Sequence, residues 1–308
     1  MKTLILTGVL MLNFSAVYAQ TVKEHNDQGL AYLKQNNYNA AVAEFNKSID
    51  ADHNNFEGYT DRALAYIKLG NLTNAVSDAT QAIEINPKFV PAYNNRGTAY
   101  IIQGKLADAI ADYTKAIELN PKTVSAYANR GRANMSRGDL TGAIADYSKA
   151  IEIDPKAESL FVDRGIVYVK KGDLTDAIAD LDKAVAINPK DNIAYTVRGT
   201  VYYNQGNLLQ AISDFSQNIV INPKDVESYM SRALTYLRSN NTSEAILDLS
   251  KVVQIDPNDA RAYFNRAVGY YQLKQFDKAW SDVHKIQRLG GTVNPDFMTA
   301  LKNATGAK

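Results

Sequence analysis

Seven arginines recur along the sequence at intervals of 34 residues. They are Arg62, Arg96, Arg130, Arg164, Arg198, Arg232 and Arg266. A guanidinium group presents its N–H donors as a planar fork that matches the two oxygens of a carboxylate. Such a row can therefore bind acidic ligands, or it can pair with carboxylates of the same chain.

Seven aspartates follow the same interval, each 16 residues after one of the arginines. They are Asp78, Asp112, Asp146, Asp180, Asp214, Asp248 and Asp282. Near the N-terminus, Gln28 and Glu44 occupy the two corresponding positions, so the arginine and the aspartate are lost together there. Because the two residue types occur as a set, we predict an internal ladder of bidentate ion pairs, in preference to a binding site for acidic ligands.

No other motif in the sequence points to catalysis. His25, His53 and His284 lack the spacing of metal ligands, and the sequence contains no cysteine, nucleophile elbow, phosphate-binding loop or H-E-x-x-H motif. We therefore predict that the protein is not an enzyme and has no catalytic residue, metal site, cofactor or small-molecule substrate.

The charge balance excludes two classes of partner. The 308 residues include 34 basic and 33 acidic side chains, which gives a formal net charge of +1, and like charges are not gathered in runs. Nucleic acids and anionic membranes are bound by basic patches. Neither is predicted as a partner.

The first nineteen residues differ in character from the rest of the chain. Lys2 precedes an apolar run from Leu4 to Phe14, and the small residues Val17 and Ala19 flank Tyr18. This order is typical of an export signal that is cleaved after Ala19, and the run is too short to span a bilayer. A buried N-terminal helix is the alternative. We expect residues 1–19 to be a signal peptide, the mature chain to have no transmembrane span, and its location to be periplasmic or extracellular.

A repeat with a period of 34 residues fills most of the chain. Proline follows Asn or Asp at Pro87, Pro121, Pro155, Pro189, Pro223 and Pro257. A fixed period of this length indicates a repeat architecture. With proline at position 32, residues 22–293 form eight repeats: 22–55, 56–89, 90–123, 124–157, 158–191, 192–225, 226–259 and 260–293.

Each repeat carries the pattern of two amphipathic helices. Positions 4, 8 and 11, such as Tyr93, Gly97 and Tyr100, lie on one stripe of a helix, and positions 20, 24 and 27 form a second stripe. Small residues at positions 8 and 20 allow the two backbones to approach, and aromatic residues fill the space around them. Glycine at position 15 and proline at position 32 end the two helices. Each repeat is therefore predicted to be a helical hairpin.

This pattern of aromatic, glycine, tyrosine, alanine and proline positions resembles the tetratricopeptide repeat (TPR). The resemblance implies an all-α fold, a right-handed superhelical solenoid of helical hairpins, with a short capping helix and tail in residues 294–308. It also implies a non-catalytic protein–protein interaction module that holds an extended segment of another protein or peptide in a concave groove lined by the first helices.

The resemblance also points to residues that bind the partner. Position 6 lines the groove in this family, and it is polar in the first five repeats, similar to the asparagine ladder that holds a peptide backbone in O-linked N-acetylglucosamine transferase. Larger apolar side chains follow in the later repeats, although the closing helix after Pro295 is an alternative cover for some of them. The predicted partner-binding residues are Asn95, Asn129, Asp163, Tyr203, Met230, Phe264 and Tyr271.

A second function remains open at this point. The lysine at position 5 that the dicarboxylate clamp of chaperone-binding TPR domains requires is missing, so that mode of binding is not expected. The alternative to groove binding is a structural or assembly subunit of a cell-envelope complex, which acts through its convex face or its ends.

Overall fold

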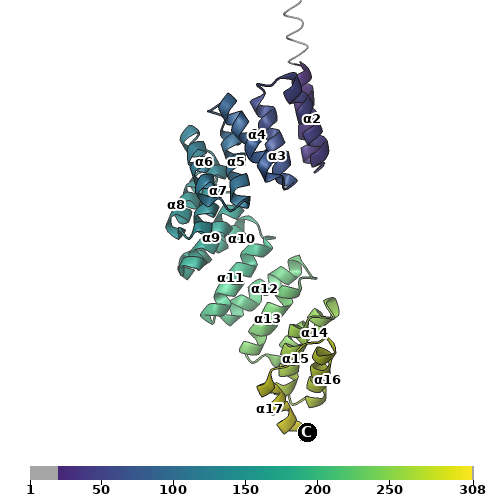
Figure 1. Cartoon of the computed structure of the whole chain (residues 1–308). Helices are drawn as coiled ribbons and strands as arrows, with labels where there is room; N and C mark the ends of the chain where they lie inside the picture. The colour runs from purple at the N-terminus through teal and green to yellow at the C-terminus, as the bar shows by residue number, and fades with distance from the viewer. Residues whose placement is uncertain (1–19, 307–308) are drawn as a thin grey trace, which may run out of the picture. The chain divides into compact units, whose positions relative to one another are not determined.

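The computed structural model describes residues 20–306, and every regular element among them is an α-helix (Figure 1). A helix over residues 20–34 comes first. It is followed by α2 (Tyr38–Ala51), α3 (Phe56–Lys68), α4 (Leu72–Ile85), α5 (Val90–Ile102), α6 (Leu106–Leu119), α7 (Val124–Arg137), α8 (Leu140–Ile153), α9 (Glu158–Lys171), α10 (Leu174–Ile187), α11 (Asn192–Gln205), α12 (Leu208–Ile221), α13 (Val226–Arg238), α14 (Thr242–Ile255), α15 (Ala260–Gln272), α16 (Phe276–Arg288) and α17 (Pro295–Thr305). The predicted all-α fold of helical hairpins is confirmed. The predicted signal peptide, residues 1–19, lies outside the described residues.

The described helices are grouped into two compact units, one that ends at Lys156 and one that begins at Ala157. Within each unit a helix packs against the next helix along the chain, and first helices of consecutive hairpins also touch. In the first unit α3 contacts α5 and α5 contacts α7, and in the second unit α9 contacts α11 and α13 contacts α15. We call the surface carried by these helices the first-helix face of each unit.

The ends of the helices follow from a few residue types. Gly104 and Gly138 have φ values of +76° and +90°, the left-handed conformation that closes the first helix of a hairpin. Asn36, Asn240 and Lys274 adopt the same conformation in the repeats that lack this glycine. At the other end of the hairpin, the residue before the proline, such as Asn86, is extended, which is the conformation that a following proline favours. Asp52 is extended as well, although His53 follows it.

The two helices of each hairpin meet where the residue at position 8 of the first helix faces the side chain at position 24 of the second. A Cβ atom added to Gly97 would lie 2.8 Å from Cε1 of the buried Tyr113 ring, which occupies position 24. The glycines of four other repeats meet the side chain at position 24 in the same way: Gly29 with Phe45, Gly131 with Tyr147, Gly165 with Leu181, and Gly199 with Phe215. Position 8 is glycine in each of the four repeats with an aromatic ring at position 24, and alanine in three of the four repeats without one, as in the pair Ala233 and Leu249. An aromatic ring at position 24 is thus always paired with the smallest residue at position 8, although Gly165 also faces a leucine.

We predict that Gly97→Ala destabilises the protein by about 1–3 kcal/mol, because the added methyl group overlaps the buried ring of Tyr113. The double variant Gly97→Ala with Tyr113→Leu reproduces the natural pair Ala233 and Leu249, and should be less destabilised than the sum of its two single variants. Urea unfolding followed by circular dichroism measures all three. Wild-type stability of Gly97→Ala would show that the contact is loose.

Candidate functional site

The structure forms all seven of the arginine–aspartate pairs, with the same two-bond geometry. Arg96 donates from Nε to Oδ2 of Asp112 over 2.9 Å and from Nη2 to Oδ1 over 2.7 Å. The same fork is formed by Arg62 with Asp78, Arg130 with Asp146, Arg164 with Asp180, Arg198 with Asp214, Arg232 with Asp248, and Arg266 with Asp282. The seven aspartates are buried. Each pair joins the first helix of a hairpin to the second.

A third donor of the guanidinium reaches into the preceding repeat. Arg96 Nη1 donates to Thr80 Oγ1 over 3.1 Å, and Arg130 Nη1 donates to Thr114 Oγ1 over 3.0 Å. The corresponding acceptors are Asn46 for Arg62, Asp182 for Arg198, Ser216 for Arg232 and Ser250 for Arg266. All of them occupy position 25, which carries a side-chain oxygen in every one of these repeats. The arginine thus links three helices of two repeats.

Tyrosine rings cover the faces of the guanidinium group. The Cζ atom of Arg62 lies 5.4 Å from the centroid of the Tyr59 ring and 6.0 Å from that of Tyr66, which are positions 4 and 11. These are cation–π distances. In the third repeat, hydrogen bonds to Asp112 raise the pKa of Arg96 above its ordinary value, against the opposing effect of burial. The arginine row is therefore engaged inside the protein and does not present a surface to acidic ligands.

The first repeat replaces the arginine–aspartate pair with different residues. His25 Nδ1 lies 2.7 Å from Oε2 of Glu44, and Lys47 Nζ lies 2.7 Å from Oε1 of the same carboxylate. Hydrogen bonds from Lys47 and His25 lower the pKa of Glu44. Since Glu44 holds the position of the aspartate, the histidine at position 4 supplies the partner that Gln28 does not.

A polar hollow lies on the first-helix face of the first unit, between α5 and α7. Its volume is about 540 Å³. The residues that line it are Val90, Pro91, Asn94, Asn95, Thr98, Asn120, Thr123, Ser125 and Asn129, and all of them are uncharged. The structure thus brings together Asn95 and Asn129, two of the predicted partner-binding residues, and adds Asn94 and Thr123, which were not predicted.

Hydrogen bonding within this hollow is incomplete. Asn95 Nδ2 donates to the carbonyl oxygen of Thr60 over 3.0 Å, so this amide also holds α5 to α3. Asn94 Oδ1 and Thr123 Oγ1 are buried atoms without a hydrogen-bond partner among the described residues. A buried polar atom without a partner costs about 1–3 kcal/mol. The two side chains line the hollow, so a rotation that turns these atoms toward it would let a ligand donate to them and recover that free energy.

The second unit carries an apolar hollow of about 390 Å³ between α9 and α11. Its lining residues are Ile166, Val169, Lys170, Leu174, Thr196, Val197, Thr200, Val201 and Asn204. Val197 is the one apolar residue at position 6 of the repeat, where the other repeats carry Asp, Asn or Ser. The first-helix face is therefore apolar at this position in the sixth repeat alone.

The remaining predicted residues lie on the second unit. Asp163 is half-buried on α9. Tyr203 on α11 lines a smaller hollow of about 110 Å³ together with Thr200, Phe215, Ser231 and Leu234. The guanidinium of Arg238 stacks on the Tyr203 ring at 4.8 Å from its centroid.

Three of the predicted anchors are occupied by internal packing. Met230 is only 5% exposed and belongs to the core between α13 and α14. The ring centroids of Phe264 and Tyr271 lie 5.6 Å and 5.7 Å from that of Phe297, which the capping helix α17 carries. Each of these side chains thus already has an apolar neighbour from the chain itself, as the alternative of a closing helix anticipates for Phe264 and Tyr271, and their role as partner anchors stays a prediction.

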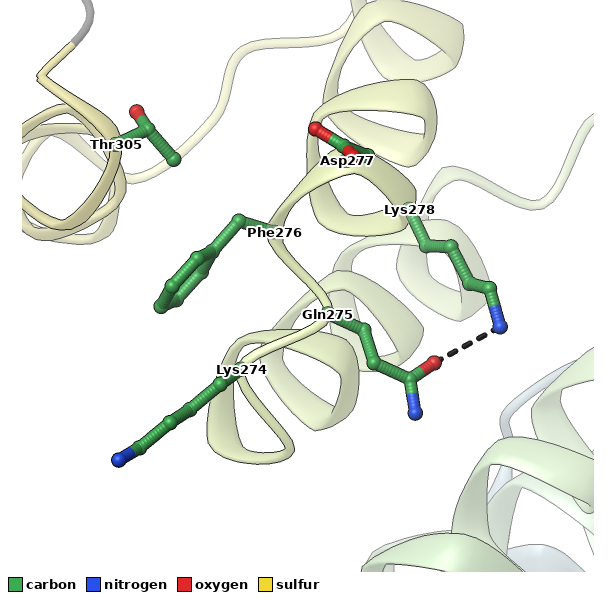
Figure 2. A pocket seen from close by; sticks show the side chains of 6 residues that line it. All are labelled: Lys274, Gln275, Phe276, Asp277, Lys278 and Thr305. Atoms are coloured by element: carbon green, nitrogen blue, oxygen red, sulfur yellow. Dashed lines mark hydrogen bonds between the residues drawn. The ribbon is translucent and has the colours of Figure 1, made fainter.

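A further hollow lies at the C-terminal end of the described chain. A hollow of about 480 Å³ is lined by Lys274, Gln275, Phe276, Asp277, Lys278 and Thr305. Figure 2 shows Lys278 turned to Gln275, to which it donates a hydrogen bond of 2.9 Å, and Asp277 directed elsewhere. Among the described residues no group of His, Asp and Glu side chains is placed to hold a metal ion, and no helix there is long and apolar enough to cross a membrane.

Models of known protein families match the chain within the predicted repeats. Two models described as "Tetratricopeptide repeat" match residues 94–158 and 56–89, and one described as "TPR repeat" matches residues 29–70, 165–206 and 235–274. The chain belongs to the tetratricopeptide-repeat family. TPR arrays are typically non-catalytic modules that bind other proteins or peptides, and the resemblance inferred from the sequence is confirmed.

Several solved TPR structures share the fold. YrrB, described as "a TPR protein with an unusual peptide-binding site", is 28% identical over 60% of this chain and 95% of its own, with a TM-score of 0.51. A TPR protein from Parabacteroides merdae is 24% identical over 81% of this chain and 98% of its own, with a TM-score of 0.56. The C-terminal part of a TPR protein from Cytophaga hutchinsonii is 20% identical over 77% and 97%, with a TM-score of 0.63. No curated protein matches the chain.

We predict that Asp112→Ala destabilises the protein by about 3–5 kcal/mol, because it leaves the half-buried guanidinium of Arg96 without its carboxylate. Glu118→Ala is the matched control in the same helix, since Glu118 is exposed and pairs only with the exposed Lys115. Urea unfolding of the two variants tests the difference. If both are equally stable, the ladder does not hold the hairpins together.

Proposed function

We propose that the protein binds an extended segment of another protein on the first-helix face of its first unit. The polar hollow between α5 and α7 would hold the main chain of that segment. The observation that carries this proposal is the pair of buried, unpaired atoms Asn94 Oδ1 and Thr123 Oγ1 in a hollow without charged residues. Main-chain N–H and C=O groups are uncharged donors and acceptors, so they could pair with the amide and hydroxyl groups of this hollow.

Two further considerations support the proposal. YrrB, which shares the fold and 28% of the aligned residues, is described as having a peptide-binding site. In addition, the arginine row is engaged internally, so the hollow between α5 and α7 is left with neutral amide and hydroxyl groups. Such groups can bind a main chain irrespective of its side chains, which suits a module that holds an extended segment.

The proposal includes an exported, non-catalytic protein. Export rests on the lysine, the apolar run and the small residues around Ala19 in the sequence. Mass spectrometry of the protein purified from its native host should find a mature N-terminus at or near Gln20. Recovery of a chain that still begins at Met1 from the cell interior would contradict it.

Photo-crosslinking in the native host tests which face binds. A crosslinking amino acid at Ser125 reports on the polar hollow, and one at Glu152 reports on the exposed surface of α8 in the same repeat. We predict partner adducts from position 125 and none from position 152. Adducts from position 152 alone would move the contact to the second helices and favour a structural or assembly subunit of an envelope complex.

We predict that Asn94→Ala combined with Asn129→Ala weakens binding of the crosslinked segment by about 1–3 kcal/mol, because the amides no longer pair with its main chain. Glu152→Ala serves as the matched control. Helical content, measured by circular dichroism, should stay the same in both variants. Wild-type affinity of the double variant, measured by isothermal titration calorimetry, would exclude the hollow as the binding site.

A further inference from the structure

One carboxylate on the first-helix face of the first unit has no partner. Asp61 lies on α3 at position 6 of its repeat, the position that Asn95 and Asn129 hold in the next two repeats. Its side chain is half-buried, and no hydrogen bond or ion pair to it is formed by the described residues. The next residue, Arg62, is turned to Asp78 and is not available to it.

The charged groups around Asp61 leave it uncompensated. On α3 itself the nearest is Glu57, one turn earlier, which repels it. The only charged residue of α5 is Arg96, which is engaged by Asp112. On α4, Asp78 pairs with Arg62 and Glu84 is exposed.

The helices that precede α3 do not compensate Asp61 either. On α2, Glu44 is paired with His25 and Lys47, and Asp50 is exposed. In the helix over residues 20–34, Lys23, Glu24, Asp27 and Lys34 are exposed.

Burial and the neighbouring Glu57 together raise the pKa of Asp61 from 3.8 to about 6. A carboxylate that is partly removed from water without a cation beside it is unfavourable in the free protein. The same loss of water strengthens its attraction to a cation that arrives with a ligand. An uncompensated group of this kind in a binding surface is a candidate for ligand recognition.

We propose that Asp61 selects a cationic side chain, lysine or arginine, in the extended segment that the first-helix face binds. The inference rests on the proposed function and deepens it: the neutral hollow between α5 and α7 would hold the main chain, and Asp61 on α3 would read one side chain. Asp27 occupies the same position in the first repeat but is exposed, so it should contribute far less.

Selection from a library of random peptides of about twelve residues, displayed on phage, provides the probe. Peptides enriched on the wild-type protein should share a lysine or arginine at one position. Selection on Asp61→Asn should lose that preference, and selection on Asp27→Asn should keep it. Enriched peptides without a basic position that still require Asn94 and Asn129 would overturn this inference and leave the proposed function standing. If no peptide is enriched, both fail.

The pH dependence of binding gives an independent readout. A selected peptide should bind about tenfold more weakly at about pH 5 than at about pH 7.5, because only about a tenth of Asp61 is then ionised. Replacing its basic residue with norleucine should abolish this dependence, as should Asp61→Asn in the protein. A dependence that persists in Asp61→Asn would assign the titrating group elsewhere.

The free protein supplies the folding control. Because the folded-state pKa of Asp61 is raised, the folded chain holds a proton that the unfolded chain has lost between about pH 4 and pH 6, so stability falls as the pH rises through this range. Asp61→Asn should therefore unfold at a higher temperature than the wild type at about pH 8 and at an equal temperature below about pH 4. A variant that is less stable at pH 8 would show that Asp61 has a structural partner, and the inference would be wrong.

Discussion

The arginine at position 7 is the residue on which the rest of the fold depends. A charged group in a packed helical hairpin is tolerated only when each of its donors meets an acceptor. The aspartate at position 23 takes two of these donors, and the oxygen at position 25 of the preceding repeat takes a third. A tyrosine at position 4 or 11 lies against the guanidinium in each of the seven repeats, and tyrosines at both positions do so at Arg62, Arg232 and Arg266. The helices must lie close for these contacts to form. Glycine or alanine at position 8 provides that closeness.

This frame restricts where a binding function can reside. Arginine, aspartate and tyrosine are engaged in every repeat from the second onward, so their charge and aromatic surface are not offered to a partner. What varies is the set of first-helix positions outside this frame. Asp61, Asn95 and Val197 occupy one such position and give it a carboxylate, an amide and an apolar side chain in turn. Specificity in this protein is therefore expected from departures from the repeat.

Much of this structure could be predicted from the sequence because every repeat must bring its two helices close together, and every repeat from the second onward must also pair its arginine. Helical hairpins, their glycine ends and the pairing of Arg96 with Asp112 follow from spacing and residue type alone. The contact of Arg96 with Thr80 was missed, although the sequence carries the signal, since position 25 holds an oxygen-bearing side chain. Because position 25 varies among Asn, Thr, Ser and Asp from repeat to repeat, its shared side-chain oxygen is a weaker sequence signal than an invariant residue.

The binding surface was less predictable, for reasons that are specific to individual residues. Met230, Phe264 and Tyr271 have the size and polarity of partner anchors, but their sequence does not reveal that α14 and α17 cover them. Likewise, nothing in the sequence indicates that Asn94 Oδ1 is buried without a partner, because this depends on how α5 and α7 meet. Tertiary packing decides which polar atoms are left free, and packing at the end of an array differs from packing in its middle.

The central claim is that one guanidinium joins two repeats, and a double-mutant cycle across Arg96 tests it most directly. Asp112 and Thr80 come from different repeats and both accept from this arginine. The free energies of unfolding of Asp112→Asn, Thr80→Val and the double variant should be non-additive by about 0.5–3 kcal/mol, with the double variant less destabilised than the sum. Ser216 accepts from Arg232 and not from Arg96, so the free energies of unfolding of Asp112→Asn and Ser216→Ala should be additive. Additivity within about 0.3 kcal/mol for Asp112 and Thr80 would contradict the claim.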